Sequence, residues 1–154
     1  MEEKTEWIEA KDMLPDESEQ ENFRWKTVAV ETFKRGVMFF IGSSKDMIKV
    51  LDEKFVGYAE VIDDLIKEEK LDKNCTALGY TFKCLPDALI WCPKEPEFNT
   101  AIHEIFHATC HILYQCEISE NQETEEVYAY LLEYLTNEFL PWILKDRPIS
   151  GNNG

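Results

Sequence analysis

The segment from residue 100 to 138 constrains this chain more than any other, because it holds every histidine of the protein and two apolar patterns of helical period. Near its start, His103, Glu104 and His107 spell H-E-x-x-H. Residues four positions apart lie on the same face of an α-helix, one turn apart. We therefore expect a helix that presents two imidazoles side by side.

Such a pair of imidazoles is suited to a metal ion. His103 and His107 can place two ring nitrogens on one Zn²⁺ at about 2.0 to 2.1 Å. Glu104 stands next to the first histidine and points off the line between the rings, where it can take a proton from a water molecule on the metal. The motif predicts a zinc site with Glu104 as general base, against the alternative of a chance motif on a helix.

A catalytic zinc needs three protein ligands and one open position, so one ligand must come from another part of the chain. His111 continues the same helix face, but at about 1.5 Å of rise per residue it lies roughly 12 Å along the axis from His103, too far to share the ion. His111 is therefore expected at the rim of a pocket or in a structural hydrogen bond.

Glu126 is the favoured third ligand, with Glu125 and Glu123 as alternatives. If the first helix ends near residues 115–116 and a second begins near 119–121, the two helices run antiparallel after a short turn. Glu126 then comes approximately level with His107. The competing interpretation is that the helix dipole simply favours a glutamate in the first turns of a helix.

These residues resemble a known group of enzymes. HEIFH, followed after eighteen residues by Glu126 in EEVYAYLLEYL, is similar to the gluzincin group of zinc metallopeptidases, whose aminopeptidase branch has the same interval. It also resembles small phage and prophage proteins with HE-x-x-HA followed by EEA-x-AYL. The resemblance covers about forty residues, a quarter of the chain. It implies His103, His107 and Glu126 as zinc ligands and Glu104 as catalytic base.

The chain also departs from that group. Tyr130 stands four residues after Glu126, where thermolysin-like members have an aspartate, and no G-A-M-E-N motif is present. Because Tyr130 lies one turn beyond Glu126 on the same face, its hydroxyl is a candidate to brace a ligand or polarise a substrate carbonyl. Tyr128 and Tyr134 compete for that role, and all three also fit core or rim positions. We include Tyr130 with Glu104 among the candidate catalytic residues.

The composition is that of one acidic globular domain. The 154 residues are 44% apolar, and the formal net charge is −15. This charge argues against nucleic acid and anionic membranes as partners and favours a basic polypeptide, or it simply keeps the surface soluble. No apolar run approaches the eighteen or so residues of a membrane span. The oligomeric state does not follow from the sequence.

The cysteines and the first residues suggest a cytoplasmic protein. The five cysteines are odd in number and include no C-x-x-C pair, so no disulfide framework is expected. The start, MEEKTEWIEAK, is acidic and lacks an apolar core, so no secretory signal is expected. Together these features predict a reducing cytoplasm.

The predicted fold is α+β, with a small mixed or antiparallel sheet of about four strands and a zincin-like helix pair. Residues 1–22 are expected to form a flexible or loosely docked leader, 23–147 a single zincin-like metallopeptidase domain, and 148–154 a frayed end. We expect strands at 27–33, 37–41, 76–83 and 88–92, and helices at 44–55 and 57–70. The metal helix follows, and then a C-terminal helix that runs to Leu140 and stops at Pro141, with one more turn at 142–148 as the alternative. Residues 77–82 are expected to pair with an extended substrate, as zinc peptidases generally use an outer strand.

Two functions are consistent with these features. One is zinc-dependent hydrolysis of peptide bonds, with Glu104 as general base. The alternative is a catalytically inactive, acidic, phage-derived interaction protein with a structural or vestigial zinc site.

Overall fold

The computed structural model describes residues 16–19, 22–54, 60, 63–64, 67, 75–79 and 87–145. Its elements are β1 (Asp16–Glu19), β2 (Arg24–Val30), the short 3-10 helix η2 (Glu31–Phe33), β3 (Arg35–Ile41), α1 (Ser44–Lys54), β4 (Thr76–Gly79), β5 (Ala88–Cys92), α3 (Phe98–Gln115) and α4 (Glu125–Leu144). The predicted helix at 57–70 and the second half of the predicted strand at 76–83 lie mostly outside the described residues.

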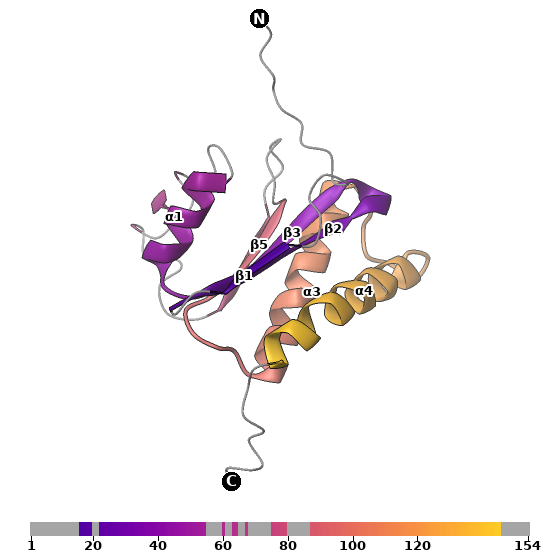
Figure 1. The fold of residues 1–154 in the computed structure, drawn as a ribbon. Coiled ribbons are helices and arrows are strands. Elements are labelled where there is room, and N and C mark those ends of the chain that lie inside the picture. Colours follow the sequence, from indigo (N-terminus) through magenta and orange to yellow (C-terminus); the bar gives the residue numbers. More distant parts are fainter. Residues whose placement is uncertain are drawn as a thin grey trace, which may run out of the picture.

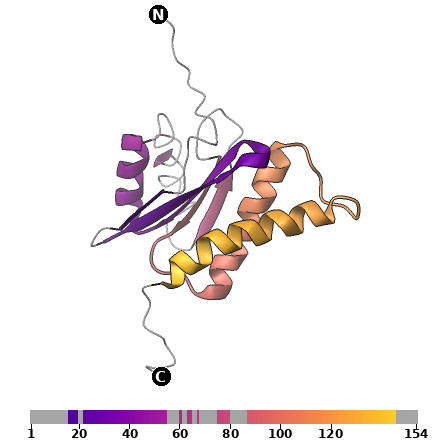
Figure 2. The same cartoon turned by 45° about the vertical axis from the view of Figure 1, so that its right-hand side comes forward.

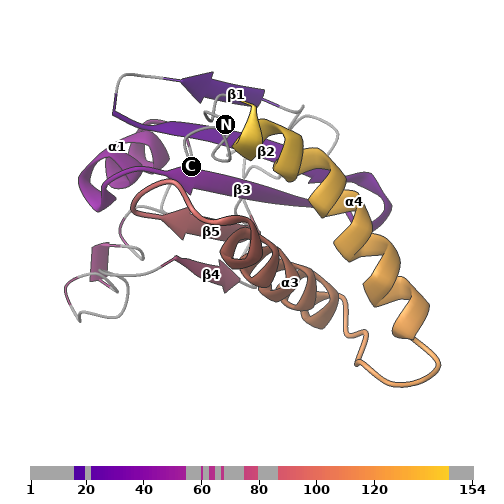
Figure 3. The ribbon, with the colours of Figure 1, turned by 90° about the horizontal axis from the view of Figure 1, so that it is seen from below.

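The strands form one mixed sheet in the order β1-β2-β3-β5-β4. Neighbouring strands are antiparallel except for β3 and β5, which are parallel. Helix α1 lies on one face of the sheet, and α3 and α4 lie side by side on the other (Figures 1 and 3). The predicted α+β class is thus confirmed.

The sheet has a fifth strand because β1 pairs with β2. This strand falls within residues 1–22, which were expected to be a flexible or loosely docked leader. The prediction was wrong for residues 16–19, since DESE has no apolar alternation to mark it as a strand.

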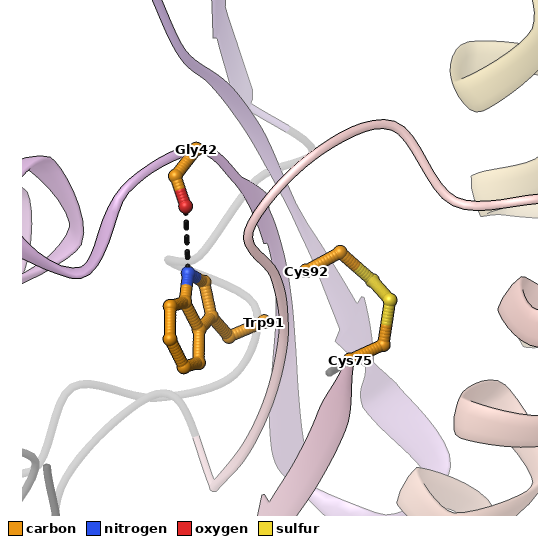
Figure 4. Close-up of a disulfide and its surroundings, with 4 residues drawn as sticks. All are labelled: Gly42, Cys75, Trp91 and Cys92. Atoms are coloured by element: carbon orange, nitrogen blue, oxygen red, sulfur yellow. Dashed lines mark hydrogen bonds between the residues drawn. A yellow bond between two sulfur atoms is a disulfide. The ribbon is translucent and has the colours of Figure 1, made fainter. Parts of the chain in front are cut away.

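Alternation along the strands divides the apolar side chains between two cores. On β3, Val37, Phe39 and Ile41 face α3 and α4, whereas Met38 and Phe40 face α1. Strand β5 follows the same rule, and Figure 4 shows Trp91 and Cys92 pointing to opposite sides. Since both faces of β3 and β5 are buried, these strands are apolar at nearly every position. They form the rigid platform on which α3 rests.

The predicted first hairpin and the helix after it are confirmed with shifted ends. Strand β2 begins at Arg24 rather than 27, and the turn includes Lys34 in the left-handed region at φ 57°. Ser43 caps α1, because its Oγ accepts a hydrogen bond of 3.1 Å from the Asp46 backbone nitrogen.

Helix α4 differs from its prediction at both ends. It begins at Glu125 rather than near 119–121, and it continues through Pro141 to Leu144. Proline costs a helix one backbone hydrogen bond, but the turn after it buries Trp142 and Ile143 in the core.

Arg24 holds this last turn of α4. Its guanidinium donates hydrogen bonds to the carbonyl oxygens of Trp142 at 2.7 Å and Ile143 at 2.8 Å. The same group makes two hydrogen bonds to the carboxylate of Glu95, at 2.9 and 2.7 Å. These bonds satisfy helix carbonyls that have no partner within α4 and fasten its C-terminal end to the sheet.

A disulfide between Cys75 and Cys92 joins β4 to β5 (Figure 4). The sequence predicted no disulfide framework, and it did not predict this pairing of two cysteines. Thr76 pairs with Trp91, so the two cysteines become direct cross-strand neighbours with Cα atoms 4.1 Å apart. Their 17-residue separation in sequence does not reveal that register. The cysteine pattern consequently no longer supports a reducing compartment.

Within the described ranges, the helices include none that is both long and apolar enough to cross a membrane.

Candidate metal centre

Helix α3 packs against three other elements of the fold. It packs against β4 and β5 with one flank and against α4 with the other. Its buried positions Ala101, Ile105, Ala108 and Ile112 recur at helical spacing and face the sheet. The outward face, which carries both histidines of the motif, is left accessible.

His103 and His107 are brought together as the sequence predicts. Their Nε2 atoms lie 3.2 Å apart, and their rings meet edge to face at 72° with centroids 4.8 Å apart. Two nitrogens bound to one tetrahedral zinc at about 2.0 to 2.1 Å would lie about 3.3 to 3.4 Å from each other. The pair is therefore spaced for one ion with almost no rearrangement, and both rings are open to solvent.

Glu104 occupies a different environment from its neighbours. Its side chain is turned toward the protein, and the residue is only 8% exposed. Burial raises the pKa of its carboxyl group, and the nearby His103 and His107 lower it in part. Nothing in the described part of the chain donates a hydrogen bond to this carboxylate. A buried carboxylate without a donor is costly, so it calls for a partner such as water, an ion or a substrate.

Glu126 is not gathered with the imidazoles. Among the described residues there is no group of three or more His, Cys, Asp or Glu side chains placed to hold a metal ion. Glu126 and the alternatives Glu123 and Glu125 are all exposed near the start of α4. Two imidazoles thus fit a zinc ion, while no third ligand is in place among the described residues.

The physical reason is the late start of α4. A helix that began near 119–121 would carry Glu126 about 8 to 10 Å back along α3, but in the structure Glu126 is only the second residue of the helix. Helices α3 and α4 also cross obliquely (Figures 2 and 3). Glu126 therefore lies in the first turn of α4.

The three tyrosines have separate roles. The hydroxyl of Tyr128 donates to the carbonyl oxygen of Ile118 at 2.7 Å, and that of Tyr134 donates to Ala29 at 2.8 Å. Both therefore hold α4 in place. Tyr130, the candidate catalytic tyrosine, is 67% exposed, and its hydroxyl has no hydrogen bond to any other described residue. It remains accessible to a substrate.

His111 lies against β4. Its Nε2 is 3.3 Å from the carbonyl oxygen of Ala77, and burial lowers the pKa of its imidazole. Gly79 packs closely on the same ring. His111 thus has the structural hydrogen bond that the sequence suggested. The reasoning from sequence did not single out Gly79, although an isolated glycine in a strand often marks a close approach of two backbones.

Strand β4 is the outermost strand on its side of the described sheet, next to α3. This is the edge at which residues 77–82 were expected to pair with a substrate. Only the part up to Gly79 lies within the described residues. An edge of this kind offers backbone groups for pairing with another chain.

Comparison with known proteins found no family model, no curated protein and no solved structure that matches this chain.

Proposed function

We propose that this protein is a zinc-dependent peptidase of the gluzincin type. His103 and His107 would hold the ion, and Glu126 would be the third ligand, with Glu125 and Glu123 as alternatives. A bound zinc ion would polarise the scissile carbonyl and acidify a water molecule. The observation that carries the proposal is the 3.2 Å separation of the two Nε2 atoms, beside a buried carboxylate to which no described residue donates a hydrogen bond.

Glu104 has the properties of a general base. A carboxylate whose pKa is raised by burial is a better proton acceptor near neutral pH than an ordinary exposed one. In the proposed reaction, Glu104 accepts a proton from the attacking water and passes it to the amine that leaves. Tyr130, exposed on α4, is available to polarise the substrate carbonyl.

The proposal requires the first turn of α4 to approach α3 when metal binds. The connection between the helices, residues 116–124, is exposed over most of its length. Arg24 fastens the C-terminal end of α4, which is the end opposite to Glu126. A movement of the first turn would also have to accommodate the hydrogen bond from Tyr128 to the carbonyl oxygen of Ile118.

The substrate would be a polypeptide in extended form. The outer edge of β4, the last strand of the described sheet on that side, is where such a chain could add a strand, and the net charge of −15 favours basic segments. A cytoplasmic location belongs to the same proposal, and the Cys75–Cys92 disulfide is the observation against it.

The decisive experiment combines metal analysis with a peptide-library cleavage screen. Protein purified without added zinc should bind one equivalent of zinc and cleave peptides. Glu104→Gln should retain the metal and lose turnover by about 10² to 10⁴-fold. Unchanged cleavage by Glu104→Gln would refute the mechanism, and a wild-type protein that binds no zinc would refute the metal site.

The second candidate is an inactive, acidic, phage-derived interaction protein with a structural or vestigial site. The observation that favours it is the absence of a third ligand within the described residues. It predicts stoichiometric zinc without turnover, or no zinc at all, in the same two measurements. A structural site would usually fill all four positions with protein ligands, which two imidazoles alone do not do.

A further inference from the structure

Strand β4 is a short element that contacts both β5 and α3. Its four residues, Thr76–Gly79, pair with β5 alone among the described strands. The disulfide between Cys75 and Cys92 fastens its beginning to β5. A four-residue strand at an edge buries little apolar surface, so further contacts are needed to fix its distance from α3.

His111 provides that contact from the helix side. Its Nε2 lies 3.3 Å from the carbonyl oxygen of Ala77, in the middle of β4. In the tautomer that donates this hydrogen bond, the ring satisfies one backbone acceptor of the edge strand. The imidazole thus ties β4 to α3 directly, independently of the pairing with β5.

Gly79 shows how closely the two elements approach. A Cβ atom added there would lie 2.5 Å from both Cβ and Cγ of His111 and 2.7 Å from its Nδ1. Distances this short are not tolerated between carbon atoms, so any side chain at position 79 would push β4 away from the helix. The glycine and the histidine together set the separation of β4 and α3.

His111 also lies near the metal pair along the helix. It follows His107 by one turn, about 6 Å along the axis. It follows Glu104 by seven residues, which places the two on the same side of α3, two turns apart. The side of α3 that carries Glu104 is therefore the side on which His111 holds β4.

We propose that His111 is a positioning residue, which holds edge strand β4 at a fixed distance from α3 so that the strand forms the wall of the site beside Glu104. This proposal rests on the proposed peptidase function for its catalytic consequence. Its structural part, that His111 orders β4, stands on the contacts with Ala77 and Gly79 alone.

The test uses the full chain and the variants His111→Ala, His111→Gln and Gly79→Ala. Hydrogen exchange of the β4 amides that pair with β5 should accelerate about three- to tenfold in His111→Ala and in Gly79→Ala. His111→Gln, which keeps a donor, should recover part of the protection. Tyr114→Ala is the matched control, because Tyr114 lies on the same helix and is 75% exposed. It should leave exchange unchanged.

Two solution measurements separate positioning from metal binding. Zinc affinity by calorimetry should stay within about threefold of wild type in His111→Ala, whereas cleavage should show a raised KM with a smaller change in kcat. Unchanged exchange in β4 would overturn the proposal, and so would a loss of zinc affinity as large as that of His107→Ala. If the wild-type protein neither binds zinc nor cleaves peptides, the proposed function fails, while the exchange measurement still decides whether His111 orders β4.

Discussion

Helix α3 presents its two imidazoles 3.2 Å apart, whereas α4 carries Glu126 in its first turn, outside any three-ligand group of the described residues. The difference lies in what brings the residues together. Residues four apart on one helix meet by local geometry alone. A ligand from the next helix depends on the length of the loop, the start of the helix and the crossing of the pair. A motif within one element is thus much better determined than a motif that spans two.

The largest expected effect is a loss of zinc affinity when the imidazole pair on α3 is broken. Replacing His107 by alanine removes half of the preformed pair, so zinc affinity should fall by at least about a thousandfold. Calorimetry with zinc, together with circular dichroism to verify the fold, measures this loss. Phe106→Ala, at the neighbouring and 38% exposed position, is the control and should change affinity little. Equal affinities for the two variants would show that the imidazole pair does not bind the ion.

The three glutamates near the start of α4 test which residue supplies the third zinc ligand. Glu126→Gln should lower zinc affinity by about ten- to a hundredfold. This loss is smaller than that of His107→Ala, because the carboxylate of Glu126 must first be brought to the ion. Glu125→Gln and Glu123→Gln are measured in the same titration, and each variant is a control for the other two. A loss confined to one of them would transfer the ligand role to that residue, and no loss in any would favour the vestigial site.

The anchored end of α4 offers a stability test. Arg24→Ala removes two hydrogen bonds to helix carbonyls and a buried stem, and should lower the free energy of unfolding by about 2 kcal/mol. Glu95→Gln should cost less, since the side chain of Glu95 is 47% exposed and its ion pair is partly screened by solvent. Urea unfolding of both variants checks this order. An equal or larger loss from Glu95→Gln would show that the ion pair, rather than the helix carbonyls, matters most.

The smallest expected effect is a change in the stability of the metal-free protein with pH. Because burial raises the pKa of Glu104, the folded state binds this proton more tightly than the unfolded state, and stability should fall as pH rises through its ionisation. Glu104→Gln removes that charge. It should therefore stabilise the metal-free protein by about 1 kcal/mol at neutral pH and flatten this part of the pH profile. Thermal unfolding from pH 4 to 8 with a chelator present measures the effect, and a destabilised variant would contradict it.

Much of the fold could be predicted because both faces of the central strands are buried. Apolar runs mark β3 and β5. The elements that the sequence did not predict share a different cause. Strand β1 is polar, and α4 continues past Pro141 because Arg24 and the buried Trp142 stabilise the last turn. In each case a contact from a distant part of the chain outweighed the local signal.

The sequence by itself determined the helix that bears H-E-x-x-H, the pairing of its two histidines and the α+β class, because helical period and apolar alternation are properties of neighbouring residues. The tertiary structure decided the rest. It set the register that joins Cys75 to Cys92, the contact of His111 with β4, and the place of Glu126 at the start of α4. These depend on how elements far apart in the chain pack together, and no local pattern encodes that packing.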